Sequence, residues 1–168
     1  LSIRAGGALN VAGAVTLSGE SLALSAAELS GATGADELRI TGKRFELGGT
    51  ATAPASASGE GRFTVAADAA TFAGGNLALG FSSVALDAGE PFAIGGSGTL
   101  TAAGDVAFSG GIVAAGPGAE FVLATPGAVS VSGGAASDAL RSALGASVAF
   151  RARAVTIDGV VAARAGRI

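Results

Sequence analysis

The feature that most constrains this chain is a repeat of short apolar pairs, in which one small or polar residue separates two apolar side chains. Between Gly74 and Val131 a pair recurs every seven or eight residues, with Gly, Ser, Asp and Pro in the gaps. This spacing predicts very short strands that bury one face. Every third pair is alike, and the best copies follow at intervals of 22 and 23 residues: Val84/Leu86, Val106/Phe108 and Val129/Val131. A repeat of three strands and three turns at this period indicates a solenoid.

The apolar pairs of the whole chain sort into three predicted stacks, one for each side of a triangular coil. The first stack contains Val15/Leu17, Leu38/Ile40, Phe63/Val65, Val84/Leu86, Val106/Phe108, Val129/Val131 and Val148/Phe150. The second contains Leu22/Leu24, Phe45/Leu47, Ala70/Phe72, Phe92/Ile94, Ile112/Ala114 and Val155/Ile157. The third contains Leu9/Val11, Leu29, Leu77/Leu79, Leu100/Ala102, Phe121/Leu123 and Val160/Ala162. The members of the first stack predict about seven coils of an all-β, right-handed parallel β-helix, the hand being that of most parallel crossovers.

Two stretches interrupt the repeat. Residues 48–61 (GGTATAPASASGEG) replace a pair of the third stack with small residues, which predicts a long loop that leaves the solenoid. Residues 133–145 (GGAASDALRSALG) carry a possible N-cap at Ser137 and a stop at Gly145, which predicts a loop with a short helix in place of a strand.

The chain is interpreted as a single β-helix segment (1–168) of a larger protein, because it opens directly on a strand pattern without Met. A β-sandwich is the alternative, since it also has many short strands with frequent turns. A sandwich does not require a triplet repeat, however, and usually buries Trp or Tyr, both of which are absent here. The inward faces also give a test: Asp in place of Val106 or Phe108 should unfold the segment, whereas an outward Thr101 should accept Asp.

Composition argues against nucleic-acid binding and against a membrane-spanning segment. Ten basic and thirteen acidic residues give a net charge of −3 without a basic stripe, so no nucleic-acid partner is expected. Every apolar run is broken by Gly, Ser, Pro or a charge, so no membrane span is expected either. The absence of Cys is compatible with a secreted or a cytosolic protein.

The residues available for chemistry predict a protein that is not an enzyme. The chain has no His, Cys or Tyr, and its turn carboxylates are scattered at Asp68, Asp87, Asp105 and Asp158. We therefore predict no catalytic, cofactor-binding or metal-binding residues. The alternative function is that of a glycan-binding or glycan-degrading β-helix domain, which would cluster carboxylates on one face.

One local concentration of positive charge stands beside the predicted loop: Arg39, Lys43, Arg44 and Arg62. One hypothesis is a ligand-binding patch for an anionic glycan or a lipid headgroup. The other is an ordinary solvated surface, in which these cations pair with the interleaved Glu37, Glu46 and Glu60.

The run SGTLTAAGDVAFSGGIVAAGPGAEFVLATPGAVSVSGG and the closing GASVAFRARAVTIDGVVAARAGRI resemble the filamentous-haemagglutinin family of large bacterial exoproteins, in the repeat-rich region toward their C-terminal part. The likeness is one of small residues, aliphatic pairs, Gly-Gly and Ala-Gly-Asp turns and the Ala-Gly-Arg-Ile ending.

The resemblance implies a structural shaft of a secreted adhesin, involved in display, cell adhesion and virulence. It also implies secretion through an outer-membrane transporter by the two-partner route, and an extracellular or outer-membrane-associated location at the bacterial cell surface. The expected partners are this transporter, the neighbouring coils of the parent chain and a host glycan or surface receptor.

Overall fold

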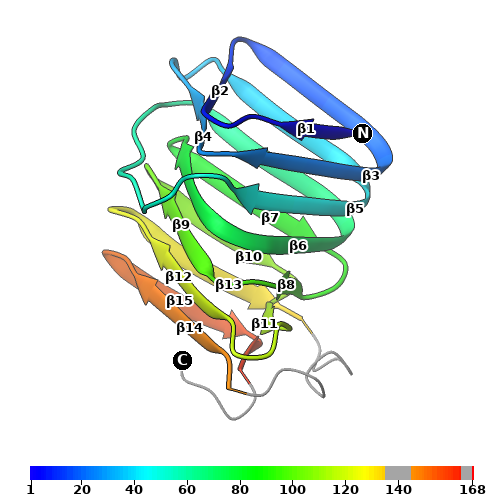
Figure 1. The fold of residues 1–168 in the computed structure, drawn as a ribbon, viewed down its shortest axis with the longest axis vertical. Coiled ribbons are helices and arrows are strands. Elements are labelled where there is room, and N and C mark those ends of the chain that lie inside the picture. The colour runs from blue at the N-terminus through cyan, green and yellow to red at the C-terminus, as the bar shows by residue number, and fades with distance from the viewer. Residues whose placement is uncertain (135–144, 164–167) are drawn as a thin grey trace.

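The computed structural model describes residues 1–134, 145–163 and 168, and these residues form a parallel β-helix. Figure 1 shows the coils stacked along the long axis, with the N-terminus at one end and the last strands at the other. No helix occurs among the described residues. The fold class predicted from the apolar pairs is thereby confirmed.

The described residues contain sixteen strands. Their bounds are β1 Ser2–Arg4, β2 Ala8–Val11, β3 Ala14–Ala26, β4 Glu28–Gly31, β5 Glu37–Gly49, β6 Arg62–Gly80, β7 Ser83–Ala88, β8 Phe92–Ile94, β9 Gly98–Ala102, β10 Asp105–Ser109, β11 Ile112–Ala114, β12 Glu120–Ala124, β13 Ala128–Gly133, β14 Ser147–Arg151, β15 Ala154–Gly159 and β16 Val161–Ala162.

The strands form three parallel sheets, one on each side of the coil. The first sheet consists of β7, β10, β13, β15 and the opening parts of β3, β5 and β6. The second consists of β1, β8, β11, β16 and the later parts of β3, β5 and β6. The third consists of β2, β4, β9, β12, β14 and the end of β6. The long strands β3, β5 and β6 therefore bend around corners and serve more than one sheet.

The register confirms six pairs of the first predicted stack. Val84, Val106 and Val129 are direct neighbours on β7, β10 and β13, in line with Val15, Leu38 and Phe63 above them. The seven strand segments of this sheet make about six complete turns. Each turn gains main-chain hydrogen bonds and apolar contacts from its neighbours, as solenoid stability requires.

The last pairs of all three predicted stacks were assigned to the wrong sheet. Val148 and Phe150 pair with β12 in the third sheet, and Val155 and Ile157 continue the first sheet below Val129 and Val131. Of the expected third-stack pair, Ala162 belongs to β16 and Val160 directly precedes this strand, which pairs with β11 in the second sheet. The reason is a skipped rung: the described residues add no strand to the second sheet between β11 and β16, which shifts every later strand by one side.

The core is a continuous column of apolar side chains inside the coil. Phe63, Phe72, Phe92, Phe108 and Phe121 are at most 1% exposed. Their rings meet across the coil, as in the edge-to-face pairs Phe72–Phe121 and Phe92–Phe108, whose ring centroids are 5.2 and 5.3 Å apart. The described chain therefore has one core and forms one unit.

The predicted loop region begins later than its sequence suggested. Gly48 and Gly49 still belong to β5, and the chain leaves the coil between Thr50 and Gly61. The third sheet closes across this departure, because β4 pairs directly with the end of β6 through Leu29 and Leu79. The short helix predicted within residues 133–145 falls on residues 135–144, which lie outside the described residues.

Candidate functional site

The structure divides the four predicted ligand-binding cations between two sheets and the corner that joins them. Arg39 and Arg62 are exposed on the first sheet, where Arg62 is in register with Glu37 of the neighbouring strand. Arg44 is exposed on the second sheet, and Lys43 lies just before it at the corner. The four side chains therefore do not form one patch.

Lys43 is engaged in a surface ion pair. Its Nζ lies 2.8 Å from Glu20 Oε1, and both side chains are mostly exposed. No other ion pair occurs in the part of the chain that the structure describes, so the predicted pairing with Glu37, Glu46 and Glu60 is not found there. An exposed pair of this kind contributes little to stability, because water and salt screen it.

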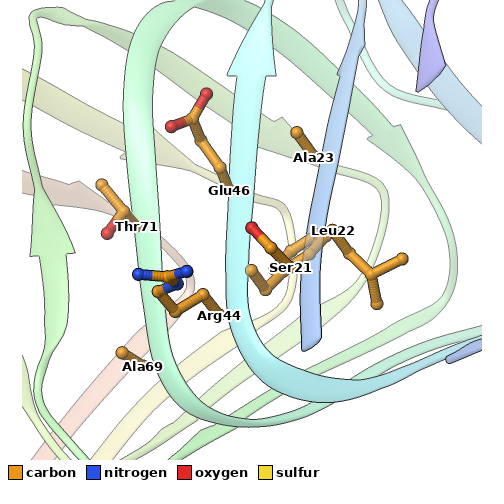
Figure 2. A pocket seen from close by; sticks show the side chains of 8 residues that line it. Ser21, Leu22, Ala23, Arg44, Glu46, Ala69 and Thr71 are labelled. Atoms are coloured by element: carbon orange, nitrogen blue, oxygen red, sulfur yellow. The ribbon is translucent and has the colours of Figure 1, made fainter. Parts of the chain in front are cut away.

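Arg44 lines a shallow depression of about 310 Å³ on the second sheet. Figure 2 shows its guanidinium reaching over toward the strand that carries Ala69 and Thr71, with Ser21 on the other side. Glu46, which lies on the same strand as Arg44, points away from the guanidinium. The depression offers a guanidinium, a carboxylate and two hydroxyls to a polar ligand, but no activated nucleophile beside a base.

A second hollow lies between the loop and the third sheet, and we call it the loop groove. It consists of two adjoining depressions of about 410 and 390 Å³, which share Ser56, Thr101, Ala124 and Arg151. Its remaining lining residues are Pro54, Ala55, Ala57, Thr99, Ala102, Val122, Thr125 and Pro126. Each depression has the volume of a small-molecule site.

The register explains how the loop groove is built. Ala78, Thr101, Ala124 and Arg151 follow one another on adjacent strands, so they form one outward column of the third sheet. The loop covers the upper part of this column and is held there by Thr101, whose Oγ1 donates a hydrogen bond to the carbonyl oxygen of Ala55 at 2.6 Å. Small side chains leave the floor open as far as Arg151, which is the one charged residue of the lining.

Sequence reasoning missed the one buried carboxylate of the described chain, Asp36, which is 6% exposed. It accepts three backbone hydrogen bonds, from the N–H groups of Gly13 (2.7 Å), Ala32 (2.9 Å) and Thr33 (2.7 Å). These bonds, first that of Gly13, lower the pKa of the Asp36 carboxyl from its usual 3.8. The three backbone bonds join Asp36 to its own turn and to Gly13 of the preceding coil, so Asp36 stabilises this corner of the coil.

Asp36 belongs to a ladder of bonds along the corner between the third and first sheets. Further along this corner, the Ser82 hydroxyl donates to the carbonyl oxygen of Gly61, and two coils later the Thr125 hydroxyl donates to that of Gly104. The Asp105 carboxylate accepts from the N–H of Ala128, one coil further on. Short polar residues do precede two of the first-sheet strands, Asp36 before β5 and Ser82 before β7. Turn chemistry alone, however, does not show that the partner of such a residue lies one coil away.

The other acidic residues remain dispersed. Asp87 lies near the end of β7 whereas Asp105 begins β10, so the two lie toward opposite ends of adjacent strands. Within the described ranges, no group of three or more His, Cys, Asp or Glu residues is placed to hold a metal ion. The arrangement therefore offers polar binding surfaces at the Arg44 depression and the loop groove.

Comparison of the chain with protein-family models, with curated proteins and with solved structures found no match. Among the described residues, no helix has the length and apolar character needed to cross a membrane.

Proposed function

We propose that this segment is part of the structural shaft of a large secreted or cell-surface adhesin-like exoprotein. The observation that carries the proposal is the continuous stack of inward side chains through about six turns. Each turn adds about 4.8 Å along the axis, so the segment supplies roughly 30 Å of reach. A parallel β-helix is stiff in this direction, because every strand is hydrogen-bonded above and below.

The surface of the described coils supports a spacer role. The outward positions of β7, β10 and β13 are mostly Ala and Ser, which make flat sides. Among the described residues, the loop groove and the Arg44 depression are hollows that could contact a ligand. The resemblance of the repeats to filamentous-haemagglutinin exoproteins points to two-partner secretion, with the outer-membrane transporter as partner of the parent chain.

Labelling of intact cells tests the proposed location. Antibodies against this segment should stain cells that produce the parent protein without permeabilisation, and protease added outside should remove the signal. Loss of the dedicated transporter should abolish surface staining. Staining that requires permeabilised cells would contradict the proposal.

The second candidate function is glycan binding. The loop groove is a better candidate site for it than the four predicted cations, which do not form one patch. Its floor combines hydroxyls with a single guanidinium, a combination suited to a sugar that carries a carboxylate. A lone Arg surrounded by small residues would orient such a ligand through a bidentate pair.

Replacement of Arg151 tests this candidate. Arg151→Gln should weaken binding of a glucuronate oligomer at least several-fold, because the bidentate charge-assisted pair is lost. Arg153→Gln is the matched control, since Arg153 is also exposed but does not line the groove. Equal binding by both variants and the parent chain, measured by calorimetry, would remove the candidate.

A further inference from the structure

The Arg44 depression carries two opposite charges that are not paired with each other. Arg44 and Glu46 are two residues apart on β5, so both side chains lie on the outer face of the second sheet, and both are exposed. The only ion pair among the described residues joins Lys43 to Glu20. That pair occupies the cation next to Arg44 in the chain, and it leaves Arg44 and Glu46 available to a ligand.

Short side chains on both neighbouring strands form the hollow around these two charges. The residues in register with Arg44 and Glu46 are Ser21, Ala23, Ala69 and Thr71. Because none of them is longer than Thr, they leave a depression of about 310 Å³ beside the guanidinium and the carboxylate. The sheet continues on both sides, through β1 and through β8, so the depression lies within the sheet and not at its edge.

The spacing of the two charges sets the length of a ligand that contacts both. Two residues of a strand span about 6.6 Å, and Figure 2 shows Glu46 pointing away from the Arg44 guanidinium. In an α-amino acid the ammonium and the carboxylate are attached to one carbon atom, so they are too close together to reach both side chains. The ligand therefore needs an anion and a cation that are joined by a chain of at least two carbons.

Each charged side chain selects one end of such a ligand. A guanidinium binds a phosphate through two parallel N–H···O bonds. The Glu46 carboxylate accepts hydrogen bonds from a primary ammonium, and the hydroxyl of Thr71, its neighbour in register, is a further acceptor. A quaternary ammonium has no N–H to donate and is bound by exposed aromatic faces, whereas the one aromatic residue of the lining, Phe45, is buried in the core.

We propose that the Arg44 depression binds a zwitterionic group in which a phosphate and a primary ammonium are separated by two carbons, as in phosphoethanolamine. The site has one charge of each sign, so a ligand with the complementary pair satisfies both. A simple anion meets the Glu46 carboxylate, and a simple cation meets the Arg44 guanidinium. This inference depends neither on the shaft role nor on glycan binding at the loop groove.

Titration with soluble O-phosphoethanolamine, followed by NMR chemical shifts at low salt, tests the site. The parent chain should bind this ester about fivefold or more tightly than inorganic phosphate, ethanolamine or O-phosphocholine, each of which lacks one of the two contacts. Arg44→Gln should weaken binding of the ester by about the same factor. Arg39→Gln is the matched control, because Arg39 is also exposed on the outer face of β5 but lies outside the depression.

Replacement of Glu46 distinguishes recognition of both charges from simple attraction to Arg44. Glu46→Gln should weaken binding of O-phosphoethanolamine and, because the repelling carboxylate is gone, strengthen binding of inorganic phosphate. The charge-exchanged variant Arg44→Glu/Glu46→Arg again has one charge of each sign, so it should recover part of the binding that Arg44→Glu alone loses. Melting followed by circular dichroism verifies that each variant is folded.

Vesicles distinguish the two sources of this group. Cosedimentation with phosphatidylcholine vesicles only when phosphatidylethanolamine is added would identify a lipid headgroup, whereas binding of the soluble ester without cosedimentation would identify a soluble or glycan-attached ester. Failure of the parent chain to bind either probe would overturn the proposal. Equal losses in Arg44→Gln and Arg39→Gln, or undiminished binding of the ester by Glu46→Gln, would also overturn it.

Discussion

At the residue scale, Asp36 shows how a single polar side chain fixes a corner of the coil. Its carboxylate joins three backbone amides, two from its own turn and one from Gly13 in the preceding coil. The next coil is attached through its main chain, because the N–H of Arg62 donates to the Asp36 carbonyl oxygen at 2.9 Å. Gly61 completes this corner with a φ of 88°, and a Cβ at Gly61 would collide with that same oxygen.

The lowered pKa of Asp36 predicts how stability depends on pH. Because the folded pKa lies below the unfolded value of 3.8, the carboxylate contributes its full stabilisation above about pH 4 to 5, and this contribution is lost as the pH falls through the folded pKa. Asp36→Asn should lower Tm at pH 7 and flatten this acid dependence. Asp68→Asn is the control, since Asp68 is exposed. An unchanged acid dependence of Tm in Asp36→Asn would contradict the assignment.

At the element scale, the loop between Thr50 and Gly61 is held against the third sheet by specific hydrogen bonds. Asn76 Nδ2 donates to the Ala51 carbonyl oxygen at 3.2 Å near the start of the loop, and Thr101 holds Ala55 near its middle. Thr101 does point outward, as predicted from the pattern, yet it lies under the loop. Asp at this position would set a carboxylate against two carbonyl oxygens, so free tolerance is no longer expected.

Thr101→Val tests the attachment of the loop. The substitution removes the bonds to Ala55 and Leu77, so we expect a stability loss of about 0.5–1.5 kcal/mol. The loop should also become sensitive to limited proteolysis between residues 50 and 60. Thr99→Val, two residues earlier on the same strand, should leave cleavage unchanged. Cleavage of the parent chain at the same rate would show that Thr101 does not hold the loop.

At the scale of the whole molecule, the coils behave as interchangeable units, and this predicts that one coil can be removed. Deletion of residues 105–127 joins Gly104 to Ala128 and places Val129 in the position that Val106 occupies. The shortened chain should fold, melt at a lower temperature and lose about 4.8 Å of length by small-angle scattering. Deletion of residues 105–115 alone should prevent folding, because later strands would arrive on the wrong side. Equal behaviour of the two deletions would argue against interchangeable coils.

The sequence by itself determined the strands, the triplet repeat and the parallel β-helix. The alternation of apolar and small residues is a local property, and stacking is the way that such short strands bury their apolar faces. Only the tertiary structure decided which sheet receives Val148 and Val155, because the length of the connection before them sets the phase. It also revealed the packing of Phe81 on Phe63, with ring centroids 5.7 Å apart, although Phe81 belongs to no apolar pair. The bond from Gly13 to Asp36 and the loop bond of Thr101 required the structure for the same reason, since each joins residues about one coil or more apart whose proximity no local pattern encodes.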